Sequence, residues 1–303
     1  MINRLISHIL PHLPQKLVWQ FSKDYIAGET VQAAIDASLA LNREKTLVTL
    51  DILGEFIETM DQARENRDQY IRLINTVEKT EVQGNYSIKP TMFGLLLDKE
   101  TCFQYMRDIV AAAAAHANFV RIDMENSPTV DDTIAVFRRI KAEFPANVGL
   151  VVQAYLKRTR SDIEALLDLK SKEDGLNLRL CKGIYVESPA IAYKKYHEIN
   201  AHYLEDLEFM FRNRIYPGIA THDKPLIQGA LDLIKKYSVP KDGYEFQMLY
   251  GVTPKQRQRL VEDGHKLRVY VPFGEHWFGY STRRLKENPA MVSHIVKALI
   301  ARG

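Results

Sequence analysis

Short apolar runs alternate with longer amphipathic stretches along most of this chain, and no other feature limits its fold as strongly. Eight runs rich in β-branched and aromatic residues are typical of strands: 46–50, 86–89, 119–123, 148–153, 177–181, 218–221, 245–249 and 267–271. The stretches between them carry apolar residues three and four positions apart, which predicts helices at 61–79, 101–115, 130–144, 162–169, 192–212, 225–237 and 254–263. Such alternation favours a parallel sheet covered by helices.

Eight strand-and-helix units in a chain of 303 residues are what a (β/α)8 barrel of the TIM type requires. The competing fold, an open doubly wound sheet, usually carries a G-x-G-x-x-G turn after its first strand. Here the first strand is followed by Asp51-Ile52-Leu53-Gly54, with a single glycine. We therefore expect one α/β domain with a helical arm at 1–45, a (β/α)8 barrel at 46–303 and a C-terminal helix over the barrel mouth.

Three local signals predict where helices begin and end. Ser161, with Glu164 three residues later, resembles a capping box at a helix start. Thr253-Pro254 places a capping hydroxyl before a proline at the first helical position. Gly264 stands where a helix should stop.

The composition argues against several classes of function. Charged residues make up 26% of the chain and net to +3 without a basic stripe, so nucleic acid is not an expected partner. Cys102 and Cys181 are far apart and have no metal-binding spacing, which is typical of a reducing compartment. No apolar run reaches the roughly 18 residues of a membrane span, and residues 1–10 are amphipathic rather than a signal peptide. We expect a cytoplasmic protein, with peripheral contact at the inner face of the cell membrane as a further option.

Polar side chains stand at the ends of most predicted strands, where a buried strand would otherwise stay apolar. They are Lys89, Asp123, Gln153, Arg179, Lys182, His222 and Tyr270. In TIM-type barrels the active site lies at the carboxyl ends of the strands, so these side chains should share one mouth. Cationic groups dominate the set, which predicts a mouth that binds anions. Lys182-Gly183 suits a phosphate, because glycine lets the backbone approach it closely.

A helix predicted after the last strand adds a second group of cations. Its one face would carry Tyr280, Arg283, Arg284, Glu287 and Asn288, at spacings of three and four. Planar guanidinium groups bind a carboxylate through two parallel hydrogen bonds, which lysine does less well. This face therefore predicts a clamp for a small carboxylate.

Five motifs in this order resemble the proline dehydrogenase family, in its short monofunctional bacterial form. They are LRLCKGIY at 178–185, ATHD at 220–223, EFQML at 245–249, RVYVPFG at 268–274 and YSTRRLKEN at 280–288. The resemblance implies a distorted (β/α)8 barrel that holds FAD and oxidises L-proline to Δ1-pyrroline-5-carboxylate, the first step of proline catabolism to glutamate. It implies hydride transfer from proline C5 to flavin N5, with the electrons then passed to a quinone.

The resemblance also implies a role for each matching residue. Lys89, Arg283 and Arg284 would hold the carboxylate of proline, and Asp123 would orient the arginine pair. Arg179 would be the second catalytic residue, beside flavin N5, and Gln153 would bond the pyrimidine edge of the flavin. The walls of the substrate ring would be Tyr185, Leu249, Tyr270 and Tyr280. The rest of the FAD site would be Met124, Lys182, Gly183, Ile184, Thr221 and His222. No metal is expected, because no partners with metal-ligand spacing surround His222.

A quinone acceptor implies contact with a membrane surface. The apolar stripes at 2–10 and 292–300 are candidates for that contact, although both could instead dock onto the barrel. The chain has no room for the aldehyde dehydrogenase domain or the DNA-binding segment of the longer members of the family. Its product would therefore pass to a separate pyrroline-5-carboxylate dehydrogenase.

Two other functions stay open at the level of sequence. A barrel with lysines at its strand ends could be a Schiff-base aldolase that uses Lys89 or Lys182. It could also be a ligand-binding barrel without catalysis, although the many polar strand ends argue against a dead site.

Overall fold

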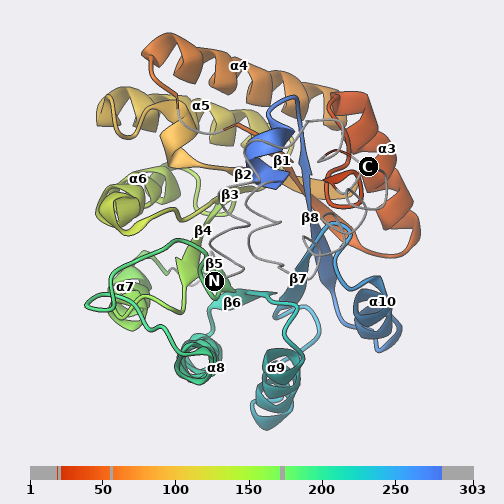
Figure 1. Cartoon of the computed structure of the whole chain (residues 1–303), viewed down its shortest axis with the longest axis vertical. Helices are drawn as coiled ribbons and strands as arrows, with labels where there is room; N and C mark the ends of the chain where they lie inside the picture. Colours follow the sequence, from red (N-terminus) through yellow and green to blue (C-terminus); the bar gives the residue numbers. More distant parts are fainter. Residues whose placement is uncertain (1–18, 20–21, 55–56, 171–174, 282–303) are drawn as a thin grey trace, which may run out of the picture.

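Eight parallel strands close into a barrel in the order β1 to β8 (Figure 1). The computed structural model describes residues 19, 22–54, 57–170 and 175–281. The strands are β1 (Leu47–Ile52), β2 (Gly84–Ile88), β3 (Val120–Ile122), β4 (Val148–Gln153), β5 (Asn177–Cys181), β6 (Tyr216–Ala220), β7 (Glu245–Leu249) and β8 (Leu267–Phe273). Since β1 pairs in parallel with both β2 and β8, the sheet has no open edge, and the expected (β/α)8 barrel is confirmed.

Helices follow the strands and surround the barrel in Figure 1. They are α3 (Val31–Arg43), α4 (Met60–Val77), α5 (Lys99–Ala114), α6 (Val130–Glu143), α7 (Thr159–Ala165), α8 (Tyr196–Arg212), α9 (Lys224–Lys236) and α10 (Pro254–Glu262), with short 3₁₀ turns η2 (Pro90–Phe93), η3 (Ser127–Thr129) and η4 (Leu166–Leu169). In the described part of the chain, no helix is long and apolar enough to cross a membrane.

The predicted bounds of β4, β5 and β7 are confirmed, and the other strands differ by one or two residues at an end. The largest change at a carboxyl end is in β1 and β8, where the ladder continues as far as Ile52 opposite Phe273. This extension places Asp51 inside the strand, opposite Pro272. The side chain of Asp51 therefore alternates with Leu50 and shares the inner face of the barrel with Thr49.

The predicted helix start at Ser161 is wrong. Helix α7 begins at Thr159, whose hydroxyl donates to the carbonyl of Gln153 and so ties the helix start to the end of β4. The Ser161 hydroxyl instead donates to the carbonyl of Arg158 within the first turn. The predicted helix 162–169 is therefore α7 followed by the 3₁₀ turn η4.

The helix predicted from residue 192 begins later, at Tyr196. The reason is that Ala192 forms an isolated antiparallel bridge with Leu156, and the Tyr193 N–H donates to the carbonyl of Tyr155 at 2.8 Å. These bonds fold the β5–α8 loop over the end of β4. The helix end at Gly264 is confirmed, since α10 stops at Glu262 and Gly264 has a φ of 75°.

Helix α3 lies beside β1 and β8, between α10 and α4 in the ring of Figure 1. The segment that precedes it runs along the end of β8, where the Ala27 N–H donates to the carbonyl of Pro272 at 3.0 Å and the Gly274 N–H to the carbonyl of Gly28 at 3.0 Å. An N-terminal helix thus covers the seam between the first and last strands. Residues 1–18 and the C-terminal helix expected over the mouth lie outside the described residues, and the division into arm and barrel stays a prediction.

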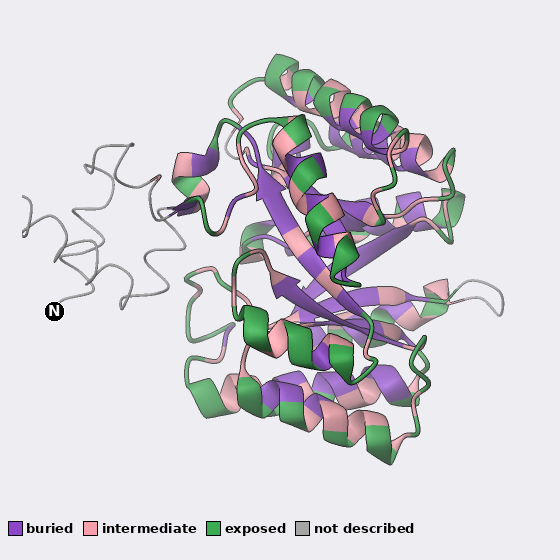
Figure 2. Cartoon of the chain, turned by 90° about the vertical axis from the view of Figure 1, so that its right-hand side faces the viewer, coloured by how far each residue is buried: buried purple, intermediate pink, exposed green. Residues whose placement is uncertain are grey.

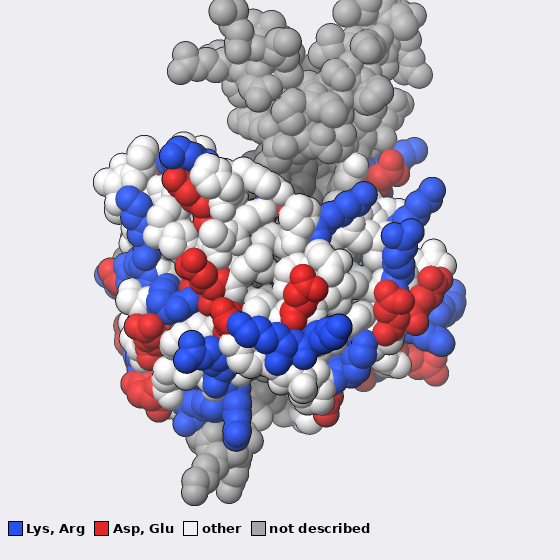
Figure 3. Space-filling model, turned by 90° about the horizontal axis from the view of Figure 1, so that it is seen from below, with Lys and Arg blue, Asp and Glu red and all other residues white. Residues whose placement is uncertain are grey.

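Apolar side chains between the strands and the helices form the main core (Figure 2). The strand residues that face the helices are apolar and fully buried, as in Val48, Leu50, Tyr86 and Ile88. Burying one such side chain contributes about 1.5–3 kcal/mol. The outward faces of the helices are exposed in Figure 2, and on the side over α8 and α9 basic and acidic side chains stand close together (Figure 3).

The inner face of the barrel is polar and crowded, and two glycines make room for it. A Cβ atom on Gly149 of β4 would lie 2.4 Å from Nη1 of Arg121, and one on Gly218 of β6 would lie 2.5 Å from Nε2 of Gln247. Neither distance is sterically allowed. The long polar side chains of β3 and β7 therefore cross the interior only because these two strands carry no side chain there.

Candidate functional site

A network of hydrogen-bonded polar side chains crosses the barrel interior near the carboxyl ends of the strands. Asp123, directly after β3, lies at the centre of this network. Its Oδ1 accepts from Nη1 of Arg179 and from Oγ of Ser87, both at 2.7 Å. Its Oδ2 accepts from the hydroxyl of Tyr270 at 2.9 Å. Both oxygens are thus satisfied, as a buried carboxylate requires.

Lys89, directly after β2, lies between two carboxylates. Its Nζ is 2.7 Å from Oδ1 of Asp51 and 4.0 Å from Oδ2 of Asp123. It also donates to the hydroxyl of Tyr270 at 3.2 Å. The structure therefore brings together four residues that the sequence placed at one site: Lys89, Asp123, Arg179 and Tyr270.

The partners of these four were missed at the level of sequence. Asp51 was left out because the first strand was taken to end at Leu50, although polar residues at 49 and 51 alternate with apolar ones and could have shown it. Ser87 was missed because a serine within a strand carries no signal of its own. The pKa of the Asp51 carboxyl is raised, mainly by burial. The charge of Lys89 acts to lower this pKa, and the charge of Asp123 acts to raise it.

The same hydrogen-bond network extends deeper into the barrel, where it fixes the guanidinium group of Arg179. Nε of Arg179 donates to Oε1 of Gln247 at 2.5 Å, and Nε2 of Gln247 donates to Oε1 of Glu245 at 2.6 Å. Glu245 in turn accepts from Nε of Arg268 at 2.9 Å. Side chains from β5, β7 and β8 thus brace one another, so Arg179 is held in one orientation.

A second cluster surrounds Lys182 at the ends of β5 and β6. Its Nζ pairs with Oδ2 of Asp223 and lies 4.4 Å from the centre of the Tyr196 ring. The Tyr196 hydroxyl donates to Oδ1 of Asp223 at 2.9 Å. Burial acts to raise the pKa of Asp223, but hydrogen bonds from Lys182 and Tyr196 outweigh it and lower that pKa. Asp223 therefore stays charged and holds Lys182 at the rim.

His222 and Leu249, predicted for cofactor and substrate, contact each other directly. The Leu249 N–H donates to Nε2 of His222 at 2.9 Å, so this ring nitrogen acts as an acceptor. The Gln256 amide donates to the carbonyl of His222 at 3.2 Å. The β6 and β7 ends are therefore tied together. Within the described residues, no group of three His, Cys, Asp or Glu side chains could hold a metal ion.

Gly183 is required for a reason that the sequence did not show. Its φ is 106°, and a Cβ atom there would lie 2.0 Å from Cδ1 of Tyr155. The Tyr155 ring, placed by the loop after β4, packs close to the backbone of the turn after β5. Close packing of this ring explains the glycine without any bound phosphate.

The remaining predicted residues also lie at the mouth where the structure describes them. Met124 and Thr221 are buried, Tyr185 and Tyr280 are partly buried, and Ile184 is 48% exposed. Arg283, Arg284, Glu287 and Asn288 lie outside the described residues.

Two polar atoms at the mouth have no hydrogen-bond partner among the described residues and could bind a cofactor. Nε and Nη1 of Arg179 are engaged, but its Nη2 has no hydrogen-bond partner within the described residues. Gln153 donates through Nε2 to the carbonyl of Glu125 at 2.9 Å, whereas its Oε1 accepts from none of the described residues. A donor and an acceptor on the neighbouring strands β5 and β4 suit a flat heterocycle with both carbonyl oxygens and N–H groups. They fit the flavin expected from the sequence.

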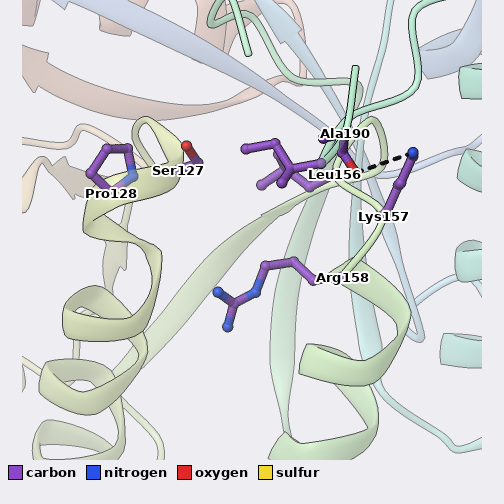
Figure 4. Close-up of a pocket in the computed structure, with 7 residues that line it drawn as sticks. Ser127, Pro128, Leu156, Lys157, Arg158 and Ala190 are labelled. Atoms are coloured by element: carbon purple, nitrogen blue, oxygen red, sulfur yellow. Dashed lines mark hydrogen bonds between the residues drawn. The ribbon is translucent and has the colours of Figure 1, made fainter. Parts of the chain in front are cut away.

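A separate pocket of about 400 Å³ lies outside the barrel interior, between the starts of α6 and α7 (Figure 4). It is lined by Ser127, Pro128, Leu156, Lys157, Arg158, Ala190 and Ile191. Lys157 donates to the carbonyl of Ala190 at 3.2 Å, and Arg158 forms ion pairs with Asp131 and Asp162. Both cations are engaged in these bonds, and the pocket lies apart from the polar side chains that the strand ends bring together.

Comparisons with known proteins give relatives along nearly the whole chain. Residues 34–297 match the sequence profile of the family described as Proline dehydrogenase. Proline dehydrogenase 1 of Bacillus subtilis (strain 168) is 32% identical over 98% of this chain and 99% of its own length. The proline dehydrogenase of Deinococcus radiodurans is 32% identical over 95% of this chain and 93% of its own length.

A solved structure of proline utilization A (PutA) from Bdellovibrio bacteriovorus matches the fold with a TM-score of 0.83 at 26% identity. The match covers 88% of this chain and 32% of that chain, so this protein spans about a third of PutA.

Proposed function

Because this chain belongs to the proline dehydrogenase family, whose members oxidise proline in proline catabolism, we propose the finer steps of its reaction. The substrate is L-proline and the product Δ1-pyrroline-5-carboxylate. The cofactor is FAD, and the final electron acceptor is a quinone. The observation that carries this proposal is the network of Lys89, Tyr270, Asp123 and Arg179, which presents fixed positive charge and hydrogen bonds at the barrel mouth.

The substrate carboxylate binds to the ammonium group of Lys89, together with Arg283 and Arg284. Lys89 is suited to this because Asp51 and Tyr270 already fix its position. The walls of the ring site are Tyr185, Leu249, Tyr270 and Tyr280. The Tyr270 hydroxyl donates to Asp123, so its ring is held in one orientation beside the site.

FAD would be held by Nη2 of Arg179 and Oε1 of Gln153, which have no hydrogen-bond partner among the described residues. The strand-end residues around these two would complete the site. These are Met124, Lys182, Gly183, Ile184, Thr221 and His222. When bound, FAD supplies an acceptor at its N5 atom for the hydride that leaves proline C5. The chain's own contribution is orientation and charge, since Arg179 is braced by both Asp123 and Gln247.

Loss of the hydride requires a free electron pair on the proline nitrogen, so bound proline must first lose its amine proton. The cations at the mouth favour that loss. We therefore expect the rate of proline oxidation to rise from about pH 6 to about pH 9 in single-turnover measurements. A constant rate over this range would contradict the step.

Contact with a quinone in a membrane would be peripheral and at the barrel mouth. Among the described residues, the large apolar side chains that are exposed all follow β2 or β5: Leu96, Leu97, Ile184, Val186, Ile191 and Tyr196. Val186 is 99% exposed and Leu96 is 69% exposed. Apolar groups on the rim support an electron acceptor that approaches from a lipid surface. The downstream oxidation of the product belongs to a separate pyrroline-5-carboxylate dehydrogenase.

The Schiff-base alternative has little support from the geometry. Lys89 pairs with Asp51 and Lys182 with Asp223, and an ion pair favours the charged amine, which is not a nucleophile.

An absorption spectrum tests the proposal most directly. The purified full-length protein should show flavin bands that L-proline bleaches without oxygen and that a soluble quinone restores. A colourless protein would contradict FAD, and bands that L-proline leaves unchanged would contradict the substrate.

Arg284→Ala should raise the KM for proline about 10- to 150-fold, since a charged hydrogen bond contributes about 1.5–3 kcal/mol. Arg64→Ala, at an exposed ion pair with Asp61, is the matched control.

A further inference from the structure

Asp51 is a buried carboxylate whose hydrogen bonding is incomplete. Its side chain is 1% exposed, and its Oδ1 is 2.7 Å from Nζ of Lys89. Its Oδ2 has no hydrogen-bond partner among the residues that the structure describes. A buried carboxylate normally accepts several hydrogen bonds. Among the described residues, Lys89 is the cation that compensates the charge of Asp51.

Two tyrosine hydroxyl groups face Asp51, but each donates its hydrogen to another acceptor. The Tyr70 hydroxyl lies 3.4 Å from Oδ1 of Asp51 but donates to the carbonyl of Ser87 at 2.7 Å. The Tyr270 hydroxyl donates to Oδ2 of Asp123 at 2.9 Å. Each phenol has one hydrogen to give. Among the described residues, neither phenol therefore has a free hydrogen to replace Lys89 if its ammonium group turns to another anion.

Lys89 is the ammonium group that the proposed function assigns to the substrate carboxylate. A bound substrate would thus add a third carboxylate around Lys89, next to Asp51 and to Asp123 at 4.0 Å. Asp123 keeps its own partner, because Nη1 of Arg179 lies 2.7 Å from its Oδ1. Among the described residues, Asp51 is then the carboxylate without a compensating cation.

We propose that Asp51 is a positioning residue that competes with the substrate carboxylate for Lys89 and takes up a proton when the substrate binds. The inference rests on the proposed function, because it requires the carboxylate to bind at Lys89. In the empty site Asp51 is ionised and holds Lys89. When the substrate carboxylate takes the ammonium group, one proton from the solvent binds to Asp51 and forms a neutral carboxylic acid. No bond other than this O–H bond is formed.

The charges that face Asp51 agree with this. Lys89, directly after β2, stabilises its charged form, whereas the burial of the group and Asp123 after β3 destabilise it. Tyr70 of α4 and Tyr270 of β8 also face it, and burial raises the pKa of both phenols well above the usual value, so both stay neutral. Loss of the Lys89 contact therefore favours protonation of Asp51 further.

The test is the number of protons taken up when a carboxylate binds to the full-length protein with its cofactor. The probe is cyclopentanecarboxylate, which has the ring and carboxylate of proline but no amine. Proline itself releases a proton from its amine and would mask the uptake. Calorimetric titration near pH 7.5 in two buffers with different ionisation enthalpies should give about one proton per bound carboxylate. A value near zero would overturn the inference.

Asp51→Asn removes the titrating group and provides the second arm. In the wild type, affinity for the probe should weaken up to about tenfold for each unit of pH rise across the window where one proton is taken up. In the variant, proton uptake should vanish and the affinity should stay constant across that window. If uptake persists in Asp51→Asn, the proton goes elsewhere and the inference is wrong. Should the variant fail to fold, the wild-type proton number still decides.

Two further variants separate this inference from the proposed function. Asp206→Asn removes another buried carboxylate, which pairs with Arg160 on the outside of the barrel, and should take up protons as the wild type does. Lys89→Met should weaken binding of the probe by at least tenfold. If Lys89→Met binds as well as the wild type, the carboxylate site at Lys89 fails and both proposals fall. If it binds poorly while wild-type uptake is zero, only the role of Asp51 is refuted.

Discussion

Arg179 donates through Nη1 to Oδ1 of Asp123 at 2.7 Å, which links β5 to the end of β3 across the barrel interior. Both side chains are largely buried, at 8% and 13% exposure. A buried pair of this kind contributes little net stability over an apolar pair, yet it becomes costly when one partner is removed. The relationship therefore makes the mouth sensitive to single substitutions.

Asp123→Ala should lower the free energy of unfolding by about 3–5 kcal/mol, because it leaves Arg179 buried without its countercharge. Urea unfolding followed by circular dichroism measures this. The control is Asp168→Ala, which breaks an ion pair with Arg138 in which Asp168 is 63% exposed. That variant should lose less than about 1 kcal/mol. Equal losses in the two variants would contradict the importance of the buried pair.

Tyr270→Phe should reduce kcat/KM for proline about 10- to 100-fold. The variant keeps the ring but loses the hydroxyl that accepts from Lys89 at 3.2 Å and donates to Asp123 at 2.9 Å. Hydrogen bonds to charged groups contribute about 1.5–3 kcal/mol. Steady-state kinetics measure the effect. Tyr237→Phe, which loses a hydroxyl bond to Glu208 on the outer surface, should keep wild-type kinetics.

The stability of the protein should depend on pH through Asp206. Burial raises the pKa of this carboxyl to about 6, from 3.8, despite its ion pair with Arg160. The folded state therefore holds the proton more strongly than the unfolded state. The contribution of Asp206 is fully stabilising below pH 3.8 and is lost as the pH rises through about 6.

Asp206→Asn removes this titration. The difference in unfolding free energy between wild type and variant should fall by up to about 1.4 kcal/mol per pH unit between the two pKa values. Urea unfolding at several pH values in that window measures it. A difference that stays constant with pH would show that Asp206 does not titrate as stated.

Gly183→Ala should destabilise the protein by about 2 kcal/mol or more. The residue has a φ of 106°, and an added Cβ would lie 2.0 Å from the Tyr155 ring. Strain of the backbone alone costs about 1–3 kcal/mol. Thermal unfolding measures the loss. Gly175→Ala is the matched control, because nothing lies within 4 Å of its added Cβ, and it should unfold as the wild type does.

The barrel itself was predictable because each strand and helix is encoded locally. The apolar runs of β4, β5 and β7 carry their bounds in the sequence, and the carboxyl ends of parallel strands must meet at one mouth. That rule brought Lys89, Asp123, Arg179 and Tyr270 together before any contact was known.

The partners of these residues could not be predicted in the same way. The alternation of polar residues at 49 and 51 is a signal for Asp51, but the end of β1 is fixed only by its ladder with β8. The bonds from Arg179 to Gln247 and on to Glu245 join strands far apart in the chain and exist only once the barrel has closed. The late start of α8 likewise follows from a tertiary contact, the bridge between Leu156 and Ala192.

Helix α3 packs over the seam between β1 and β8, and the segment before it bonds to Pro272 and Gly274 at the end of β8. The first described helix thus has its partner strand more than two hundred residues later in the chain. Contacts of such long sequence separation form late and slow folding. On the ribosome, α3 can pack on β1 early but gains its contacts with β8 only after β8 has emerged, so full protection of α3 from proteases should come only at that point.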